Sequence, residues 1–460
     1  IEKSRDRKYL IISSSSSGTS EVRYLDALNP TGEFKIFSPR RKNIEYGLAH
    51  HKGYFYIITN EDAVNFKVMK ARVEESDRNK WQEFIPARNN IMIEDFEEFE
   101  NYLVISEVEN GLKKLKYYDI TKQLFQEITF DEAVYSFYLS SNPEFETDVL
   151  RYQYQSLTTP DSVFEYNFNK GESILLKQSE VLDKNYSPSN FRSERIYARA
   201  EDGMAIPISM VYHKDLAQKY KSETFPLYLT SYGAYGVSSD PYFSSIRLSL
   251  LNRGFIYAIA HIRGGQDLGR PWYNDGKLLK KKNTCNDFIS CAKLLIENGY
   301  TSKDKLVING GSAGGLLMGA VVNARPDLFK IVIADVPFVD VINTMLDPSL
   351  PLVKEEYEEW GNPNDKEYFE YILSYSPYNN IVRQNYPNML ITAGLNDPRV
   401  SYWEPAKFTA KLRELKTDNN ALILKTNMEA GHAGASGRYD YLKEIAFEYA
   451  FIFKILGIEI

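Results

Sequence analysis

The feature that most constrains the fold of this chain is a glycine-rich turn between an apolar run and a helical pattern. The stretch KLVINGGSAGGLLMGAVVNA, residues 305–324, carries Ser312 in the pattern Gly-x-Ser-x-Gly. A serine that joins a strand directly to a helix sits on a strained turn, so its neighbours must lack bulk. Its hydroxyl then lies near a helix N-terminus, which favours developing negative charge. We therefore predict a nucleophilic serine here; the alternative is a glycine-rich helix start without chemistry.

The second half of the chain, from about residue 190, alternates strand patterns with helical patterns. Such alternation is typical of βα units and predicts a mostly parallel, doubly wound sheet. The predicted strands span residues 225–230, 255–260, 305–309, 331–336, 388–393 and 421–425. One apolar stripe at helical spacing predicts a terminal helix with a buried face. Its members are Leu442, Ile445, Ala446, Tyr449, Ile452 and Phe453.

The first half, residues 1–170, has a different pattern, in which short strands are separated by turn residues. Four strand patterns each begin a repeat, at residues 8–13, 54–60, 101–107 and 148–155. Each is followed by a second strand, at residues 22–27, 66–71, 114–120 and 163–168. The spacing from Tyr9 to Tyr54, Tyr102 and Leu150 is 45, 48 and 48 residues. A period near 45 indicates blades of a β-propeller, and the alternative is a β-sandwich with accidental spacing.

The composition narrows the range of partners. A net charge of −7 argues against nucleic acid and anionic membranes, and no apolar run reaches the length of a membrane span. The two cysteines, Cys285 and Cys291, are too few for a disulfide framework and lie in no metal-binding cluster. We expect both to be reduced core residues of a cytoplasmic protein without metal or cofactor. No signal peptide opens the chain, which begins at Ile1, and we expect it to be trimmed or partial.

A serine hydroxyl needs a base, and the base needs an orienting acid. Of the five histidines only His432 follows Ser312, in a glycine-rich loop after a strand. The chain order serine, acid, histidine of strand–turn–helix nucleophiles therefore selects it. Asp397 comes just after the strand at 388–393, whereas the other aspartates between the two lie in helix, linker, turn or strand contexts. We predict that Asp397 orients His432; the alternative is a turn residue before Pro398.

An oxyanion requires two hydrogen-bond donors. The backbone N–H of Ala313, directly after the serine, is one candidate. The second is expected in the loop after the strand at 225–230, where the sequence reads SYGAYG at residues 231–236. Tyr232 could donate from its phenol there, or it could be a buried aromatic residue without such a role.

Several stretches of this sequence resemble those of a known family. The second half resembles the peptidase domain of the prolyl oligopeptidase family, and most closely its oligopeptidase B branch. The segment at residues 156–167, SLTTPDSVFEYN, resembles the end of that family's propeller. Besides the serine motif, the matching stretches are SYGAYG, LLNRGFIYAIAHIRGG, WYNDGKLLKKKNTCNDF, DVPFVDV, EEWGNPN, YSPYNNI and YWEPAKFTAKLRELKT.

The resemblance implies an α/β-hydrolase catalytic domain at residues 186–460 and a β-propeller part at residues 1–185. The family's propeller has seven blades and admits only short peptides, whereas this chain shows about four repeats. The propeller would then be incomplete, with a missing N-terminal segment of the same protein as a partner. The resemblance also implies a serine peptidase with Ser312, Asp397 and His432 as its triad, and it supports Tyr232 beside the Ala313 N–H as oxyanion donors.

Oligopeptidase B enzymes cleave after Arg or Lys, and the resemblance assigns that recognition to the acidic run LVKEEYEEWGNPN at residues 352–364. Glu356 and Glu358 match the two pocket glutamates, although most such runs are solvated faces. Two residues apart on a regular helix they would diverge by about 200°. We therefore expect irregular or extended backbone there.

Two further residues match substrate-binding positions of the family. Asp240 matches the first acid of a site for a second basic residue, but Tyr242 stands where a second acid is typical. Arg399 resembles an arginine that binds the substrate backbone. The expected function is a serine oligopeptidase for short basic peptides; the alternatives are an esterase or thioesterase, a prolyl-specific oligopeptidase, and a non-enzymatic propeller scaffold.

Overall fold

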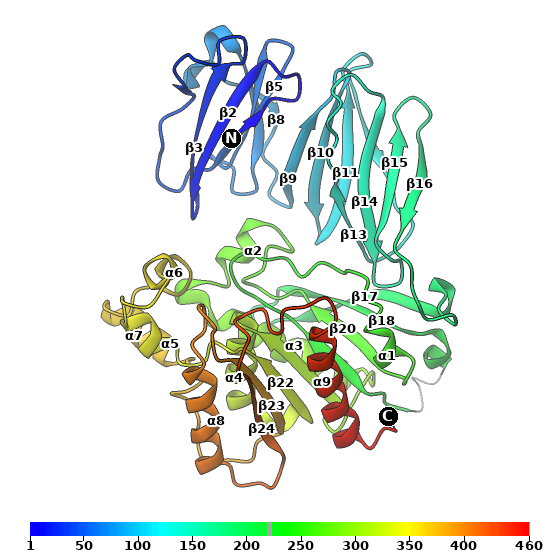
Figure 1. Ribbon diagram of the computed structural model, residues 1–460, viewed down its shortest axis with the longest axis vertical. Helices are drawn as coiled ribbons and strands as arrows, with labels where there is room; N and C mark the ends of the chain where they lie inside the picture. Colours follow the sequence, from blue (N-terminus) through cyan, green and yellow to red (C-terminus); the bar gives the residue numbers. More distant parts are fainter. Residues whose placement is uncertain (219–222, 460) are drawn as a thin grey trace. The chain divides into compact units, whose positions relative to one another are not determined.

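The computed structural model describes residues 1–218 and 223–459 and divides the chain into two compact units (Figure 1). Unit 1 comprises Ile1–Glu180 together with the short segment Asp267–Pro271. Unit 2 comprises Val181–Gln266 and Trp272–Ile460. The sequence indicated one change of pattern near residue 190, but not the later segment that belongs to the first unit.

Unit 1 contains four antiparallel sheets of four strands each, in which sheet neighbours are also neighbours in sequence. The first two sheets hold β1 (Glu2–Lys3), β2 (Tyr9–Ser16), β3 (Thr19–Asp26), β4 (Lys35–Ile36), β5 (Tyr46–His51), β6 (Tyr54–Thr59), β7 (Lys67–Arg72) and β8 (Gln82–Ile85). The other two hold β9 (Ile91–Glu98), β10 (Tyr102–Glu109), β11 (Leu112–Asp119), β12 (Leu124–Ile128), β13 (Tyr135–Leu139), β14 (Val149–Ser156), β15 (Ser162–Asn167) and β16 (Glu172–Gln178). The predicted strands are confirmed, and they form the two central strands of each sheet.

Each pair of consecutive sheets in unit 1 shares a hydrophobic core. Val22 of β3 packs with Phe55 and Ile57 of β6, and Tyr56 on the opposite side of β6 packs with Phe96 of β9. Successive residues of a strand point to opposite faces, so one strand serves two cores. The sequence repeat therefore reflects a repeated packing arrangement, in which each apolar face of a four-stranded sheet is covered by a neighbouring sheet.

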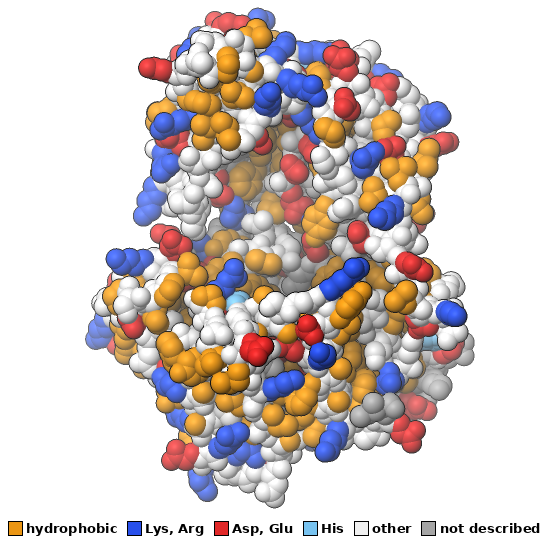
Figure 2. Space-filling model, in the orientation of Figure 1, with side chains coloured by type: hydrophobic (Ala, Val, Ile, Leu, Met, Phe, Trp, Pro, Cys, Tyr) orange, Lys and Arg blue, Asp and Glu red, His pale blue; other side chains and the backbone are white. Residues whose placement is uncertain are grey.

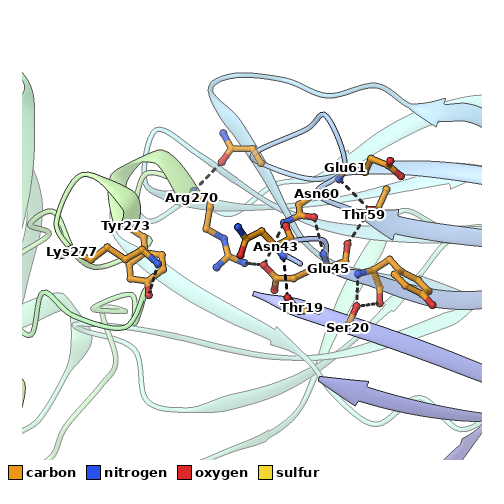
Figure 3. A network of polar contacts seen from close by, with 12 residues as sticks. Thr19, Ser20, Asn43, Glu45, Thr59, Asn60, Glu61, Arg270, Tyr273 and Lys277 are labelled. Atoms are coloured by element: carbon orange, nitrogen blue, oxygen red, sulfur yellow. Dashed lines mark hydrogen bonds and ion pairs between the residues drawn. The ribbon is translucent and has the colours of Figure 1, made fainter. Parts of the chain in front are cut away.

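The segment Asp267–Pro271 is bound to unit 1 by specific contacts (Figure 3). The Arg270 guanidinium lies 2.9 Å from the Glu45 carboxylate, and the Arg270 N–H donates to Asn65 Oδ1 at 2.9 Å. Gly269 has a φ of +92°, and a Cβ there would lie 2.6 Å from Asn65 Oδ1. Only glycine allows this close approach of the backbone.

Unit 2 is built on one eight-stranded sheet in the order β17-β18-β20-β19-β21-β22-β23-β24. The pairs β17–β18 and β18–β20 are antiparallel and the remaining pairs are parallel. The strands are β17 (Phe191–Arg199), β18 (Ala205–His213), β19 (Leu227–Thr230), β20 (Ile256–Ala260), β21 (Leu306–Gly311), β22 (Ile331–Asp335), β23 (Asn388–Gly394) and β24 (Leu422–Asn427). The mostly parallel sheet and its six predicted strands are confirmed.

The helices of unit 2 lie between these strands along the chain, except for the terminal helix. They are α1 (Leu248–Leu251), α2 (Arg270–Asn274, which begins in unit 1), α3 (Lys282–Glu297), α4 (Ala313–Ala324), α5 (Val341–Leu346), α6 (Val353–Trp360), α7 (Lys366–Leu373), α8 (Trp403–Leu415) and α9 (Tyr441–Leu456). Both cysteines lie buried and free in α3, as predicted. No helix in the described part of the chain is long and apolar enough to cross a membrane.

The terminal helix α9 departs from the predicted burial pattern. Ile452 and Phe453 are buried in its C-terminal half, but Leu442 and Ala446 in its N-terminal half are exposed. Figure 2 shows hydrophobic side chains on the face of unit 2 where α9 lies in Figure 1. The prediction of one continuous buried face is therefore wrong, because a helical period identifies an apolar stripe but not the neighbour that covers it.

Helix α8 carries a buried carboxyl group that organises the start of α5. Glu404 is 1% exposed and accepts hydrogen bonds from the backbone N–H groups of Val339 and Asp340, both at 2.9 Å. It also accepts one from the Thr344 hydroxyl at 2.6 Å. Burial raises the pKa of Glu404 to about 7 despite these donors.

The folded protein should therefore hold a proton on Glu404 between pH 4.5 and about 7 that the unfolded chain has lost. Its free energy of unfolding should fall as pH rises through this window, by roughly 3 kcal/mol. Glu404→Gln should remove this loss, whereas Glu414→Gln, at an exposed position of the same helix, should keep it. Urea unfolding between pH 4 and 8 measures the difference, and parallel curves for wild type and Glu404→Gln would contradict it.

Candidate active site

Ser312 occupies a strained turn between β21 and α4. Its φ of 55° and ψ of −118° lie in a region that residues with a side chain rarely adopt. Gly310 and Gly315 make the turn feasible, because a Cβ on Gly310 would collide with the Gly314 carbonyl and one on Gly315 would lie 2.5 Å from Pro337 Cα. The predicted strand–turn–helix context of the serine is confirmed.

Backbone hydrogen bonds from the neighbouring strand hold this turn in place. The Ser312 N–H donates to the Asp335 carbonyl at the end of β22, at 2.8 Å. The Ser312 carbonyl accepts from the Phe338 N–H at 3.1 Å. These surrounding hydrogen bonds allow a backbone strain of about 1–3 kcal/mol to persist at Ser312.

His432 and Asp397 meet at the C-terminal ends of β24 and β23. His432 Nδ1 lies 2.7 Å from Asp397 Oδ2, and the Asp397 side chain is 1% exposed. The other carboxylate oxygen accepts from the backbone N–H groups of Arg399 and Val400, at 2.9 and 3.0 Å. A carboxylate held on both oxygens orients the imidazole and favours the imidazolium that forms during proton transfer.

The structure thus joins two of the three residues predicted to act together. The hydrogen bonds among the described residues do not include one between Ser312 and His432. Hydrogen bonds of a catalytic base are often long in an unliganded protein and tighten with substrate.

The two groups predicted as oxyanion donors, on Tyr232 and Ala313, adjoin the serine in the structure. The Tyr232 side chain is half-buried and forms a hydrogen bond with Ser312. Burial raises the pKa of Tyr232, and the charges of Glu356 and Glu359 act in the same direction, so the phenol keeps its proton. The N–H of Ala313 lies in the first turn of α4, where backbone donors have no partner within the helix.

The acidic run forms a regular helix, α6, so the expectation of irregular backbone there is wrong. The helix starts after Leu352, which has a φ of +71°, and ends at Gly361, which has a φ of +92°. Glutamates in a first helical turn are favoured by the helix dipole. Glu356 and Glu358 consequently diverge around the helix axis, and Glu358 is exposed.

Glu356 is the half-buried glutamate of this helix. Its Oε2 accepts from the Tyr235 hydroxyl and from the Trp360 indole N–H, both at 2.7 Å. Burial raises the pKa of Glu356, and these two hydrogen bonds lower it. Tyr235 also lies next to Tyr232, with ring centroids 6.3 Å apart, so it links this carboxylate to the tyrosine predicted as an oxyanion donor.

Glu359, which the sequence did not single out, is the buried glutamate of α6, at 3% exposure. It accepts from the Tyr235 N–H at 3.0 Å and from the Tyr273 hydroxyl at 2.7 Å. Lys281 Nζ lies 3.8 Å from its carboxylate. The sequence signal that could have identified Glu359 is its spacing of three residues from Glu356, since residues i and i+3 share a helix face.

The two remaining predicted residues lie in loops of unit 2. Asp240 is half-buried, and its backbone carbonyl accepts from the Tyr242 N–H at 3.0 Å. Arg399 is exposed, and its backbone N–H donates to Asp397 Oδ1 at 2.9 Å. In the described residues no group of three or more His, Cys, Asp or Glu side chains is arranged to hold a metal ion.

A serine on a strained strand–helix turn, a histidine bound to a buried aspartate, and a tyrosine donor are the parts of a serine hydrolase. Two family descriptions match the sequence. The prolyl oligopeptidase family matches residues 241–459, and the N-terminal β-propeller domain of prolyl oligopeptidase matches residues 1–179. The chain belongs to the prolyl oligopeptidase family, on the branch that includes oligopeptidase B.

Individual proteins are similar over the whole chain. Dipeptidyl aminopeptidase BI from Pseudoxanthomonas mexicana is 45% identical, and protease 2 from Moraxella lacunata is 42% identical. Both comparisons cover 100% of this chain, which spans 63% and 65% of the length of these relatives.

Solved structures of oligopeptidase B are also similar. The Leishmania major structure has a TM-score of 0.91 and 41% identity, covering 99% of this chain and 65% of that one. A closed form from Trypanosoma brucei with covalently bound antipain has a TM-score of 0.92 and 41% identity, covering 100% of this chain and 66% of that one.

Asp397→Asn tests the histidine–aspartate pair. The amide should favour the wrong imidazole tautomer, so the rate at which a fluorophosphonate labels Ser312 should fall by on the order of 10³ to 10⁴-fold. Asp327→Asn is the matched control, because the Asp327 side chain is 62% exposed and paired with Arg325. Equal labelling of Asp397→Asn and wild type, followed by mass spectrometry, would exclude this role.

Proposed function

We propose that this chain carries the catalytic site of a serine oligopeptidase that hydrolyses short peptides after Arg or Lys. The observation that carries the proposal is the position of Glu356, a half-buried carboxylate held by Tyr235 and Trp360. Tyr235, which binds this carboxylate, lies next to Tyr232 with ring centroids 6.3 Å apart, and the Tyr232 side chain binds Ser312. A substrate cation paired with this carboxylate would therefore lie close to the reacting serine.

The proposal includes an α/β-hydrolase fold for residues 186–460. The order of the eight strands, the position of the serine after a parallel strand, and the chain order serine, aspartate, histidine all support it. It also takes the four sheets within residues 1–185 as propeller blades, which the shared cores between consecutive sheets support. Buried free cysteines fit a reducing compartment such as the cytoplasm.

The proposed reaction proceeds through an acyl-enzyme. His432 takes the proton of Ser312 as the serine oxygen bonds to the scissile carbonyl carbon, and Asp397 holds the imidazolium that results. The Tyr232 hydroxyl and the Ala313 N–H donate to the oxyanion. The C–N bond then breaks as the imidazolium protonates the leaving amine, and a water molecule hydrolyses the ester by the same route.

A guanidinium suits the proposed pocket better than an ammonium. Its planar fork can bind one carboxylate through two parallel hydrogen bonds. Asp240 and Arg399 stay in the proposal as contacts for a neighbouring basic residue and for the peptide backbone. The proposal makes no use of metal or cofactor chemistry.

The name of one relative suggests that dipeptide release is a second mode of attack to be tested. One is named a dipeptidyl aminopeptidase and another protease 2. Arg peptides that carry a fluorogenic amine on the Arg carbonyl, in N-acylated and free-amine forms, separate internal cleavage from dipeptide release. A small neutral ester reports esterase activity. Ester turnover without cleavage of either Arg peptide would contradict the proposal.

Glu356→Gln tests the specificity. Loss of one partner of a desolvated ion pair should lower kcat/KM for an Arg peptide by on the order of 10²-fold. Turnover of the neutral ester should survive, because the ester places no cation in the pocket. Steady-state kinetics on both substrates provide the measurement, and an equal loss on both would count against a selective pocket.

Glu358→Gln is the matched control for this test. It makes the same change two residues away, at an exposed position of α6. An exposed charge contributes little to pairing, so kcat/KM for the Arg peptide should change by less than about threefold. A loss as large as that of Glu356→Gln would support the pair of glutamates predicted from sequence.

The raised pKa of Glu356 gives the binding step a pH dependence. The carboxylate binds the cation and the carboxylic acid does not, so affinity is present above this pKa and lost as pH falls through it. KM for the Arg peptide should rise on acidification, starting at a higher pH than an ordinary glutamate allows. KM for the neutral ester, measured over the same pH range, should stay flat.

A further inference from the structure

Lys281 is a buried lysine immediately before α3, at 2% exposure. Its Nζ donates to the Gly233 carbonyl at 2.6 Å and lies 3.8 Å from the Glu359 carboxylate. The ammonium also lies 4.7 Å from the centre of the Trp360 ring. A buried cation is costly unless it is paired and hydrogen-bonded, so these contacts compensate for its burial.

The same contacts hold the loop that follows β19 at two points. The Gly233 carbonyl is bound by Lys281, and the Tyr235 N–H is bound by Glu359. Between β19 and the first of these points lies Tyr232, the residue whose side chain reaches Ser312. The loop therefore has little freedom to move its tyrosine away from the serine.

The backbone at Gly233 is tightly packed and leaves no room for a side chain. Its φ is +69°, and a Cβ there would lie 2.5 Å from Thr284 Cγ2 in α3. The loop backbone is therefore in close contact with the start of α3, where Lys281 also lies. A small shift of the lysine would have to move the loop as well.

Glu359, the carboxylate that faces Lys281, lies on α6, the helix that also carries the proposed specificity carboxylate. Glu359 and Glu356 are three residues apart on α6 and share one side of the helix. Tyr235 connects them, since its N–H donates to Glu359 and its hydroxyl donates to Glu356.

We propose that Lys281 and Glu359 form a positioning pair, which ties the loop carrying the oxyanion donor to the helix carrying the specificity carboxylate. The pair touches neither substrate nor reacting atoms. Because Lys281 balances the charge of Glu359, Glu356 is left as the carboxylate that a substrate cation meets. The inference rests on the proposed function and adds that oxyanion binding and cation recognition depend on one buried contact.

Lys281→Met tests the pair. Labelling of Ser312 by a neutral fluorophosphonate should slow at least tenfold, and kcat for the neutral ester should fall similarly with little change in KM, because the oxyanion donor is displaced. The ratio of kcat/KM for the Arg peptide to that for the ester should fall as well. The control is Lys280→Met, whose lysine is 60% exposed and paired with Asp275, and its rates should stay within twofold of wild type.

The double variant Lys281→Met/Glu359→Gln separates positioning from charge burial. It leaves no unpaired buried charge, so it should regain the stability that Lys281→Met loses in urea unfolding. Its labelling rate and kcat should stay low, because the bond to the Gly233 carbonyl is still missing. Full recovery of the rates would overturn the positioning role, and so would failure of both variants to fold, since the pair would then serve stability.

Failure of the inference can be told from failure of the proposed function. A wild-type protein that labels but does not prefer Arg peptides would refute the specificity, while the neutral reagent would still report on the loop. Wild-type rates in Lys281→Met would refute the pair and leave the proposed function intact. A wild-type protein that never labels at Ser312 would refute both.

Discussion

The proposed active site in unit 2 depends on the strained backbone at Ser312 and on the strand beside it. The backbone of Ser312, with a φ of 55°, is held by two hydrogen bonds. Its N–H donates to the Asp335 carbonyl, and its carbonyl accepts from the Phe338 N–H in the turn after β22. That neighbouring turn is itself strained, since Val336 has a φ of +39° although its side chain is branched. The Val336 N–H is held by the Thr392 hydroxyl at 3.2 Å, so three parallel strands support the turn that carries the proposed nucleophile.

Buried ion pairs position the loops around this centre. Arg263, after β20, makes two hydrogen bonds of 2.8 and 2.6 Å to the fully buried Asp287 of α3. Lys281, at the start of the same helix, binds the loop after β19. Helix α3 thus anchors two consecutive loops through charges. Such pairs are costly to break, because removing one member leaves an uncompensated charge in the core.

Much of this architecture could be predicted from local patterns. The alternation of strand residues identified the central strands of all four sheets in unit 1, and the change to βα alternation identified the parallel strands of unit 2. The errors have a common cause. The N-terminal half of α9 and the segment Asp267–Pro271 depend on which neighbour lies against them, and no local period reports that. The acidic run forms a helix bounded by Leu352 and Gly361, both with positive φ, whereas the match to a pair of pocket glutamates led us to expect irregular backbone.

By itself, the sequence determined the serine turn, the histidine and its aspartate, because chain order and a glycine-rich strand–helix junction are local properties. The resemblance to a known family added the prediction that one acidic segment lies near the site. Only the tertiary structure decided how the glutamates of that segment divide their roles. Glu358 is exposed, Glu356 faces two aromatic donors, and Glu359 binds a backbone N–H 124 residues away. Burial and pairing of a charge depend on distances between remote parts of the chain, which spacing along the sequence does not encode.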